Sequence, residues 1–121
     1  MSAKKGIILV DPYLDDQVLQ MIHLLPTTIS VHILANRISP ADFCVQVKKL
    51  RSEGYQISVR KTNTFHDRFL CIDDEWWHSG HSFKDLGGKD SLISKVEEET
   101  ALKKLRDRVE YELTNSEEYC D

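Results

Sequence analysis

The residues of this sequence best suited to chemistry are His66 and Arg68, which lie two positions apart near the start of an apolar run. Residues two apart on a β-strand point to the same face of the sheet. An arginine binds phosphate oxygens through two parallel hydrogen bonds, and a histidine beside it can act as a nucleophile or carry a proton. The pair indicates a phosphate site, although a single histidine on a strand is more often a structural residue.

A longer pattern surrounds this pair. The chain reads His66-x-Arg68-x-x-x-x-Asp73, followed by Gly80-x-Ser82-x-Lys84. This order resembles the H-x-K-x-x-x-x-D motif and the G-S-x-N element of the phospholipase D superfamily. Two further segments, Leu9–Leu14 and Ser82–Gly87, are similar to a bacterial branch of it, so that the resemblance covers about residues 6–96.

The resemblance implies a metal-independent phosphodiesterase without a cofactor, in which one histidine attacks phosphorus and a second protonates the leaving oxygen. By position, His66 is the nucleophile or its acid partner, and Arg68, Ser82 and Lys84 bind the phosphate oxygens. Asp73, at the end of the strand, supports the site from outside the first layer of contacts.

At two positions the sequence differs from the motif, and both differences bear on whether the site can cleave a substrate. Arg68 stands in place of the usual lysine, and Lys84 stands where asparagine is expected. Both residues keep or add positive charge, which suits an anionic ligand. The sequence therefore leaves three functions open. The first is a phosphodiesterase acting on nucleic acid, and the alternative is a weakly active or inactive phosphate- or nucleic-acid-binding module of a larger protein. The third is a domain that only mediates assembly.

The chain carries a single copy of the motif. Superfamily members of this kind resemble halves that pair, so the resemblance implies a homodimer whose shared site takes His66 and Arg68 from both chains, unless a longer parent protein supplies a second copy of the motif. Two-fold symmetry is the commonest arrangement of soluble oligomers. The expected partners are thus a nucleic acid or another phosphodiester and a second copy of the chain.

The surrounding elements predict an α/β domain with the order β-α-β-α-β-β-β-α and a mixed sheet flanked by helices. The apolar runs 6–11, 29–35 and 55–60 alternate with amphipathic helices over 15–25 and 40–53, which predicts three parallel strands. Pro12 is expected to end the first strand, Ser39-Pro40 to begin the second helix, and Gly54 to end it.

Further along, the strands 65–72 and 75–79 form a hairpin around Asp73-Asp74, and 91–96 is a last strand. A helix over 97–113 is expected to pack its apolar stripe on the sheet. These elements predict one domain over 1–113 and a polar, flexible tail over 114–121.

The composition of the chain indicates in which compartment the protein works and whether it contacts a membrane. Of the formal charge of −4, residues 1–96 contribute 12 Lys and Arg against 11 Asp and Glu, and residues 97–121 contribute 4 against 9. The three cysteines, widely spaced, predict no disulfide and hence a reducing, cytoplasmic setting. No apolar run is long enough to span a bilayer, and no membrane partner is expected.

Other patterns have a structural reading beside a functional one. His78-x-x-His81 has the spacing of a metal-ligand pair but lacks a complete ligand set, so no metal is predicted. One ring of Trp76-Trp77 is expected in the core. Arg60 and Lys61, just before the His66 strand, are candidates for a basic substrate-binding rim. Asp11, at the carboxyl end of the first strand, either supports the ligand site or caps the next helix.

Overall fold

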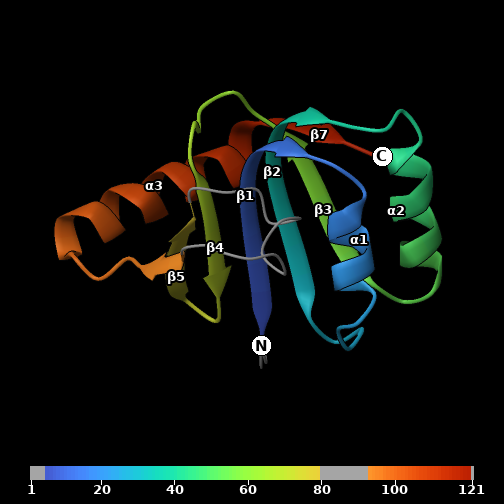
Figure 1. Ribbon diagram of the computed structural model, residues 1–121, viewed down its shortest axis with the longest axis horizontal. Helices are drawn as coiled ribbons and strands as arrows, with labels where there is room; N and C mark the ends of the chain where they lie inside the picture. The colour runs from blue at the N-terminus through green and yellow to red at the C-terminus, as the bar shows by residue number, and fades with distance from the viewer. Residues whose placement is uncertain (1–4, 80–92, 121) are drawn as a thin grey trace.

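The computed structural model describes residues 5–79 and 93–120. They form a mixed α/β domain with a seven-stranded sheet in the order β6-β5-β4-β1-β2-β3-β7 (Figure 1). The strands are β1 (Gly6–Leu14), β2 (Ser30–Ile38), β3 (Gln56–Lys61), β4 (Arg68–Ile72), β5 (Glu75–Ser79), β6 (Ile93–Lys95) and β7 (Glu117–Tyr119). The helices are α1 (Gln17–Ile22), α2 (Phe43–Ser52) and α3 (Glu99–Asn115). The predicted α/β class is confirmed at this level.

The parallel centre of the sheet follows from the apolar runs of the sequence. β1 pairs with β2, and β2 with β3, both in parallel register, as the alternation of strands and helices predicted. The connections run through α1 and α2, whose buried residues Val18, Ile22, Phe43 and Val47 pack on the same core as β-strand residues such as Ile33. Gly54 ends the α2 segment with a positive φ of 102°, a conformation that glycine adopts without strain.

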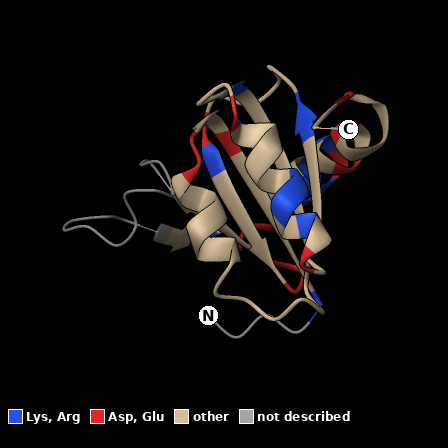
Figure 2. Cartoon of the chain, turned by 90° about the vertical axis from the view of Figure 1, so that its right-hand side faces the viewer, with Lys and Arg blue, Asp and Glu red and all other residues tan. Residues whose placement is uncertain are grey.

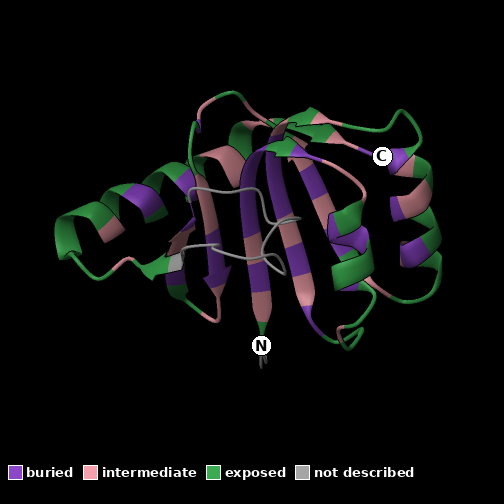
Figure 3. Ribbon diagram, in the orientation of Figure 1, coloured by how far each residue is buried: buried purple, intermediate pink, exposed green. Residues whose placement is uncertain are grey.

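Two cores lie on opposite faces of the sheet, because successive strand residues point to opposite sides. The first core lies under α1 and α2. The second lies under α3, where Leu105 and Val109 pack against Val10, Leu34 and Trp76. Figure 3 shows the resulting pattern, with buried segments concentrated in the central strands and on the inner sides of the helices. The prediction that the C-terminal helix packs on the sheet of its own domain is confirmed.

The antiparallel part begins with β4, which pairs with β1, and continues through β5 to β6. Asp73 and Asp74 join β4 to β5 with φ values of 47° and 73°, as a tight two-residue hairpin turn requires. Trp76 is buried in the second core, as predicted for one of the two indoles. Trp77 is half-buried against the first core, and the Lys95 ammonium lies 5.9 Å from its ring centre.

Two element ends differ from the expectation. β1 continues through Pro12 to Leu14, because its pairing with β4 stops at Val10 and the missing N–H of the proline therefore interrupts no ladder there. α2 begins at Phe43, with Asp42 as its N-cap residue, rather than at Ser39-Pro40.

The C-terminal segment is tied to the sheet, whereas the sequence predicted a flexible tail. β7 pairs with β3 in antiparallel register, and Cys120 forms a disulfide with Cys44 of α2. The expectation of no disulfide is therefore wrong. The pairing of a short polar strand brings together two cysteines separated by 76 residues, which their spacing alone did not indicate.

None of the described helices is long and apolar enough to cross a membrane.

Candidate functional site

One edge of the sheet gathers most of the residues that the sequence indicated. Here β1, β2 and β3 reach their carboxyl ends and the antiparallel β4 begins, since Phe69 of β4 lies opposite Val10 of β1. In open α/β sheets, ligands bind at the carboxyl ends of the parallel strands. We call this the carboxyl edge, and its exposed side chains Tyr13, Arg37, Lys61 and His66 form the candidate site.

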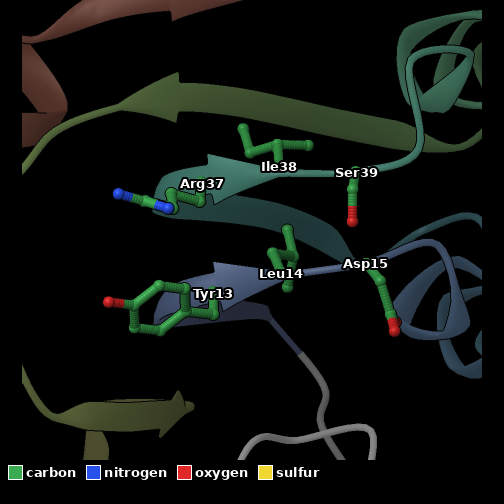
Figure 4. A pocket seen from close by; sticks show the side chains of 6 residues that line it. All are labelled: Tyr13, Leu14, Asp15, Arg37, Ile38 and Ser39. Atoms are coloured by element: carbon green, nitrogen blue, oxygen red, sulfur yellow. The ribbon is translucent and has the colours of Figure 1, made fainter.

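The best-defined feature of the carboxyl edge is a tyrosine with a guanidinium beside it. Tyr13 and Arg37 are partners in the β1–β2 register, and the Arg37 Cζ lies 5.9 Å from the centre of the Tyr13 ring. The two side chains lie next to each other and point the same way (Figure 4). The exposed fraction of Tyr13 is 56%, which is unusual for a large ring at the end of a buried strand. A planar cation beside an exposed ring suits a ligand with both phosphate and aromatic groups.

A hollow of about 310 Å³ lies at this pair. Its walls come from two short segments at the ends of neighbouring strands, Tyr13–Asp15 and Arg37–Ser39. Leu14 and Ile38 supply its apolar middle, while Asp15 and Ser39 line its far end (Figure 4). The hollow is thus apolar at its centre, with polar groups at both ends.

The two residues of the expected basic rim have different surroundings. Arg60 Nη1 donates a hydrogen bond of 2.5 Å to the Ser116 carbonyl oxygen, and Nη2 lies 3.3 Å from a Glu118 carboxylate oxygen. Lys61 is exposed and lies opposite Glu117 in the β3–β7 register. Acidic β7 therefore lies against the basic end of β3. Figure 2 shows other basic segments on α2, where Lys48, Lys49 and Arg51 lie in one helix.

Arg68 lies in a buried ion pair. Its Nε is 3.2 Å from Oδ1 of Asp11, whose side chain is fully buried, and only 20% of the Arg68 side chain is exposed. Asp11 also accepts a 3.0 Å hydrogen bond from the Tyr13 backbone N–H, so it does not cap the following helix. The charge of Arg68 is compensated inside the domain, which leaves it poorly placed to bind an external phosphate.

His66 lies outside β4, which begins at Arg68. The expectation that both side chains share one face of a strand is therefore wrong, because the strand alternation starts only after His66. His66 is exposed, and it makes no hydrogen bond or ion pair with any residue in the described ranges 5–79 and 93–120.

Asp73 lies at the opposite end of β4 from His66. Its Oδ1 accepts hydrogen bonds from the backbone N–H groups of Lys5 and Gly6, at 2.8 and 3.2 Å. This carboxylate holds the hairpin turn to the start of β1. Ser82 and Lys84 lie outside the described residues.

A metal site has no support in the described part of the chain, where no group of three His, Cys, Asp or Glu side chains could hold an ion. His78 Nε2 lies 3.7 Å from Asp67 Oδ2, too far for a hydrogen bond, and its ring packs 5.2 Å from that of Phe69. His81 lies outside the described residues.

The titratable groups whose pKa is shifted lie away from the carboxyl edge. Burial, and secondarily the nearby Arg60 charge, lowers the pKa of His32. Burial raises the pKa of the Cys71 thiol, which therefore stays protonated and unreactive. Hydrogen bonds from the Ala101 and Thr100 backbone N–H groups to Glu98 at the start of α3 lower the pKa of that carboxyl.

No protein-family model matches the chain, and no curated protein matches it. Among solved structures, the chain is similar to TrmBL2, described as an archaeal chromatin protein with a novel mode of DNA binding. The TM-score is 0.60 and the sequence identity 12%, so the likeness concerns the fold alone. It covers 98% of this chain and 46% of that one, which means that the chain spans about half the length of the protein it matches.

These comparisons correct the family and the activity expected from the sequence. The assignment to the phospholipase D superfamily is wrong, since the similar structure is that of a chromatin protein. The expected metal-independent phosphodiesterase or nuclease with a phosphohistidine intermediate is wrong for the same reason. The geometry agrees with this correction, because Arg68 is paired with Asp11 and His66 lies outside the strand.

Sequence reasoning missed Tyr13 and Arg37. Tyr13 lies in the Leu9–Leu14 segment of the resemblance but was given no role, Arg37 belongs to no motif, and each follows an apolar run from which it could not be linked to the other. The available signal was position alone, since both residues come at the carboxyl ends of strands predicted to be parallel neighbours.

Proposed function

We propose that this domain is a nucleic-acid-binding module that holds phosphate groups at the carboxyl edge and performs no chemistry on them. The observation that carries the proposal is the Tyr13–Arg37 pair, an exposed ring with a guanidinium 5.9 Å from its centre. Arginine contributes two parallel hydrogen bonds to a phosphate, and an aromatic ring offers a face to a base or a sugar.

The position of Lys61 supports the same proposal. Lys61 is on β3 and lies opposite Ala35 of β2, and Arg37 is two residues further along β2. Their backbones are therefore separated by one strand spacing, about 4.8 Å, and by about 6.6 Å along the strand. Two long, flexible cations on neighbouring strands at this end of the sheet suit a polyanion.

The likeness to TrmBL2 is consistent with a nucleic-acid partner, since that protein is described as binding DNA. The match covers less than half of that chain, in keeping with a module that works within a larger protein. The homodimer expected from the sequence no longer has support, because that expectation rested on a shared catalytic site. The cytoplasmic setting also loses its argument from the cysteines, and a disulfide alone does not decide the compartment.

The charge of the chain sets the expected strength of binding. With a formal charge of −4 and acidic β7 beside β3, the domain attracts nucleic acid through a few local cations. Such binding is weak and depends on salt, because each neutralised phosphate releases bound counterions.

Fluorescence anisotropy with labelled oligonucleotides at 50 and 200 mM salt tests the proposal. Arg37→Ala should weaken binding roughly tenfold at low salt. It should also make the negative slope of log affinity against log salt concentration less steep by about one. Arg108→Ala, which removes an exposed arginine from α3, is the matched control and should bind like the wild type. Binding that is absent in the wild type, or equally weakened by both substitutions, would refute the proposal.

A further inference from the structure

We infer that the ligand of the carboxyl edge is single-stranded nucleic acid, with a base stacked on Tyr13 and a neighbouring phosphate bound by Arg37. This inference rests on the proposed function and names its ligand more narrowly. It extends to DNA and RNA alike, because unpaired bases offer the same ring faces in both.

The exposure of Tyr13 is the first argument. More than half of this side chain is open to solvent, although the neighbouring residues Pro12 and Leu14 are buried. Within the described residues no aromatic ring contacts it, and the Arg37 guanidinium is its cation–π partner. The ring is therefore held in place at one side while it remains accessible. Unpaired bases stack on such rings, whereas the bases of a duplex are already stacked on one another.

The shape of the hollow is the second argument. Its volume of about 310 Å³ lies at the lower end of the range for sites that bind small molecules, and it suits one nucleotide rather than the width of a duplex. Leu14 and Ile38 form an apolar floor between the ring and the polar end. Ser39 and Asp15 at that end carry oxygen atoms of the kind that accept hydrogen bonds from base amino groups.

The balance of charge is the third argument. Double-stranded DNA carries one charge per roughly 1.7 Å of axis, and its affinity for proteins comes chiefly from many phosphate contacts. Among the described residues, the carboxyl edge offers Arg37 and Lys61, while Arg60 is occupied by Glu118 and Arg68 by Asp11. Two such cations on an acidic chain are few for a duplex. They suffice for a single strand, where stacking provides the remaining affinity.

The test compares a labelled single-stranded 12-mer, as DNA and as RNA, with the duplex of the same sequence. Tyr13→Leu keeps apolar bulk but removes the ring, and Tyr13→Phe keeps the ring. We expect the wild type to bind the single strands several-fold more tightly than the duplex. Tyr13→Leu should lose roughly tenfold on single strands, and Tyr13→Phe should stay within about twofold of the wild type.

A strand with abasic sites in place of its bases provides the decisive comparison. The wild type should bind the abasic strand roughly tenfold more weakly than the normal strand. Tyr13→Leu should bind the abasic strand about as tightly as the wild type does, because the stacking needs both the ring and the base. Duplex binding that equals or exceeds single-strand binding, or a Tyr13→Leu variant that binds like the wild type, would overturn the inference. If binding then still depends on Arg37, the proposed function stands; if no oligonucleotide binds, both fall.

Discussion

The buried ion pair between Asp11 and Arg68 provides a direct test of the structural role that we assign to the former candidate catalytic arginine. The Asp11 side chain is fully buried and lies 3.2 Å from Arg68 Nε. Arg68→Met removes the charge but keeps much of the side-chain length. It should therefore lower the free energy of unfolding by about 3–5 kcal/mol, because it removes the guanidinium that lies beside a fully buried carboxylate.

The reciprocal change should be milder. In Asp11→Asn the side-chain oxygen can still accept the hydrogen bond from the Tyr13 N–H, and the remaining cation belongs to a side chain that is 20% exposed. We expect a loss of about 1–3 kcal/mol. The double variant should be more stable than the sum of the two losses predicts, because the two side chains contact each other and the second substitution removes a group whose charged partner is already gone.

Urea unfolding followed by tryptophan fluorescence measures these differences through the midpoint and the slope of the transition. Arg108→Ala on the exposed side of α3 is the control and should stay within about 0.5 kcal/mol of the wild type. An Arg68→Met variant as stable as this control would refute the structural role of the Arg68–Asp11 ion pair.

Two further predictions concern charge elsewhere in the domain. Replacing both Glu117 and Glu118 by glutamine should strengthen oligonucleotide binding several-fold at low salt, because their carboxylates lie opposite the basic end of β3. Fluorescence anisotropy measures the affinity, and Glu110→Gln on α3 is the control that should leave it unchanged. An affinity of the double variant equal to that of the wild type would contradict the prediction. Stability should fall as the pH drops below 6.5, because the pKa of His32 is lowered in the folded state and the unfolded chain therefore binds the proton first. Urea midpoints between pH 7.5 and 5 should thus decline less steeply in His32→Gln than in the wild type, and equal slopes would remove His32 as a cause.

The sequence predicted those parts of the fold in which local pattern and long-range packing agree. The apolar runs of β1, β2 and β3 alternate with amphipathic helices, and this order leaves little choice other than a parallel sheet. The turn at Asp73-Asp74 was predictable because aspartate tolerates positive φ better than most residues. In each case the residues that determine the element lie close together in the chain.

The elements that depend on distant partners could not be predicted in this way. β7 has three polar or aromatic residues and becomes a strand only through the edge of β3. The Cys44–Cys120 disulfide follows from that pairing rather than from any spacing of the cysteines. Pro12, read alone, ends a strand, yet the missing β4 pairing beyond Val10 allows β1 to continue.

The candidate site shows the same division. The motif around His66 drew attention to the end of the sheet at which we propose that the ligand binds, but its chemistry was wrong, because the ion pair of Arg68 with Asp11 is a tertiary contact. Tyr13 and Arg37 had no chemical role assigned from the sequence, and they meet only because β1 and β2 are in parallel register.

An amide chemical-shift titration of the ¹⁵N-labelled domain with a single-stranded oligonucleotide shows directly whether the carboxyl edge binds nucleic acid. We expect the largest shifts at the carboxyl edge, in residues 13–15, 37–39 and around Lys61, and much smaller shifts in Arg37→Ala at the same oligonucleotide concentration. Shifts that fall instead on the outer surface of α1 and α2, or that persist unchanged in Arg37→Ala, would contradict it.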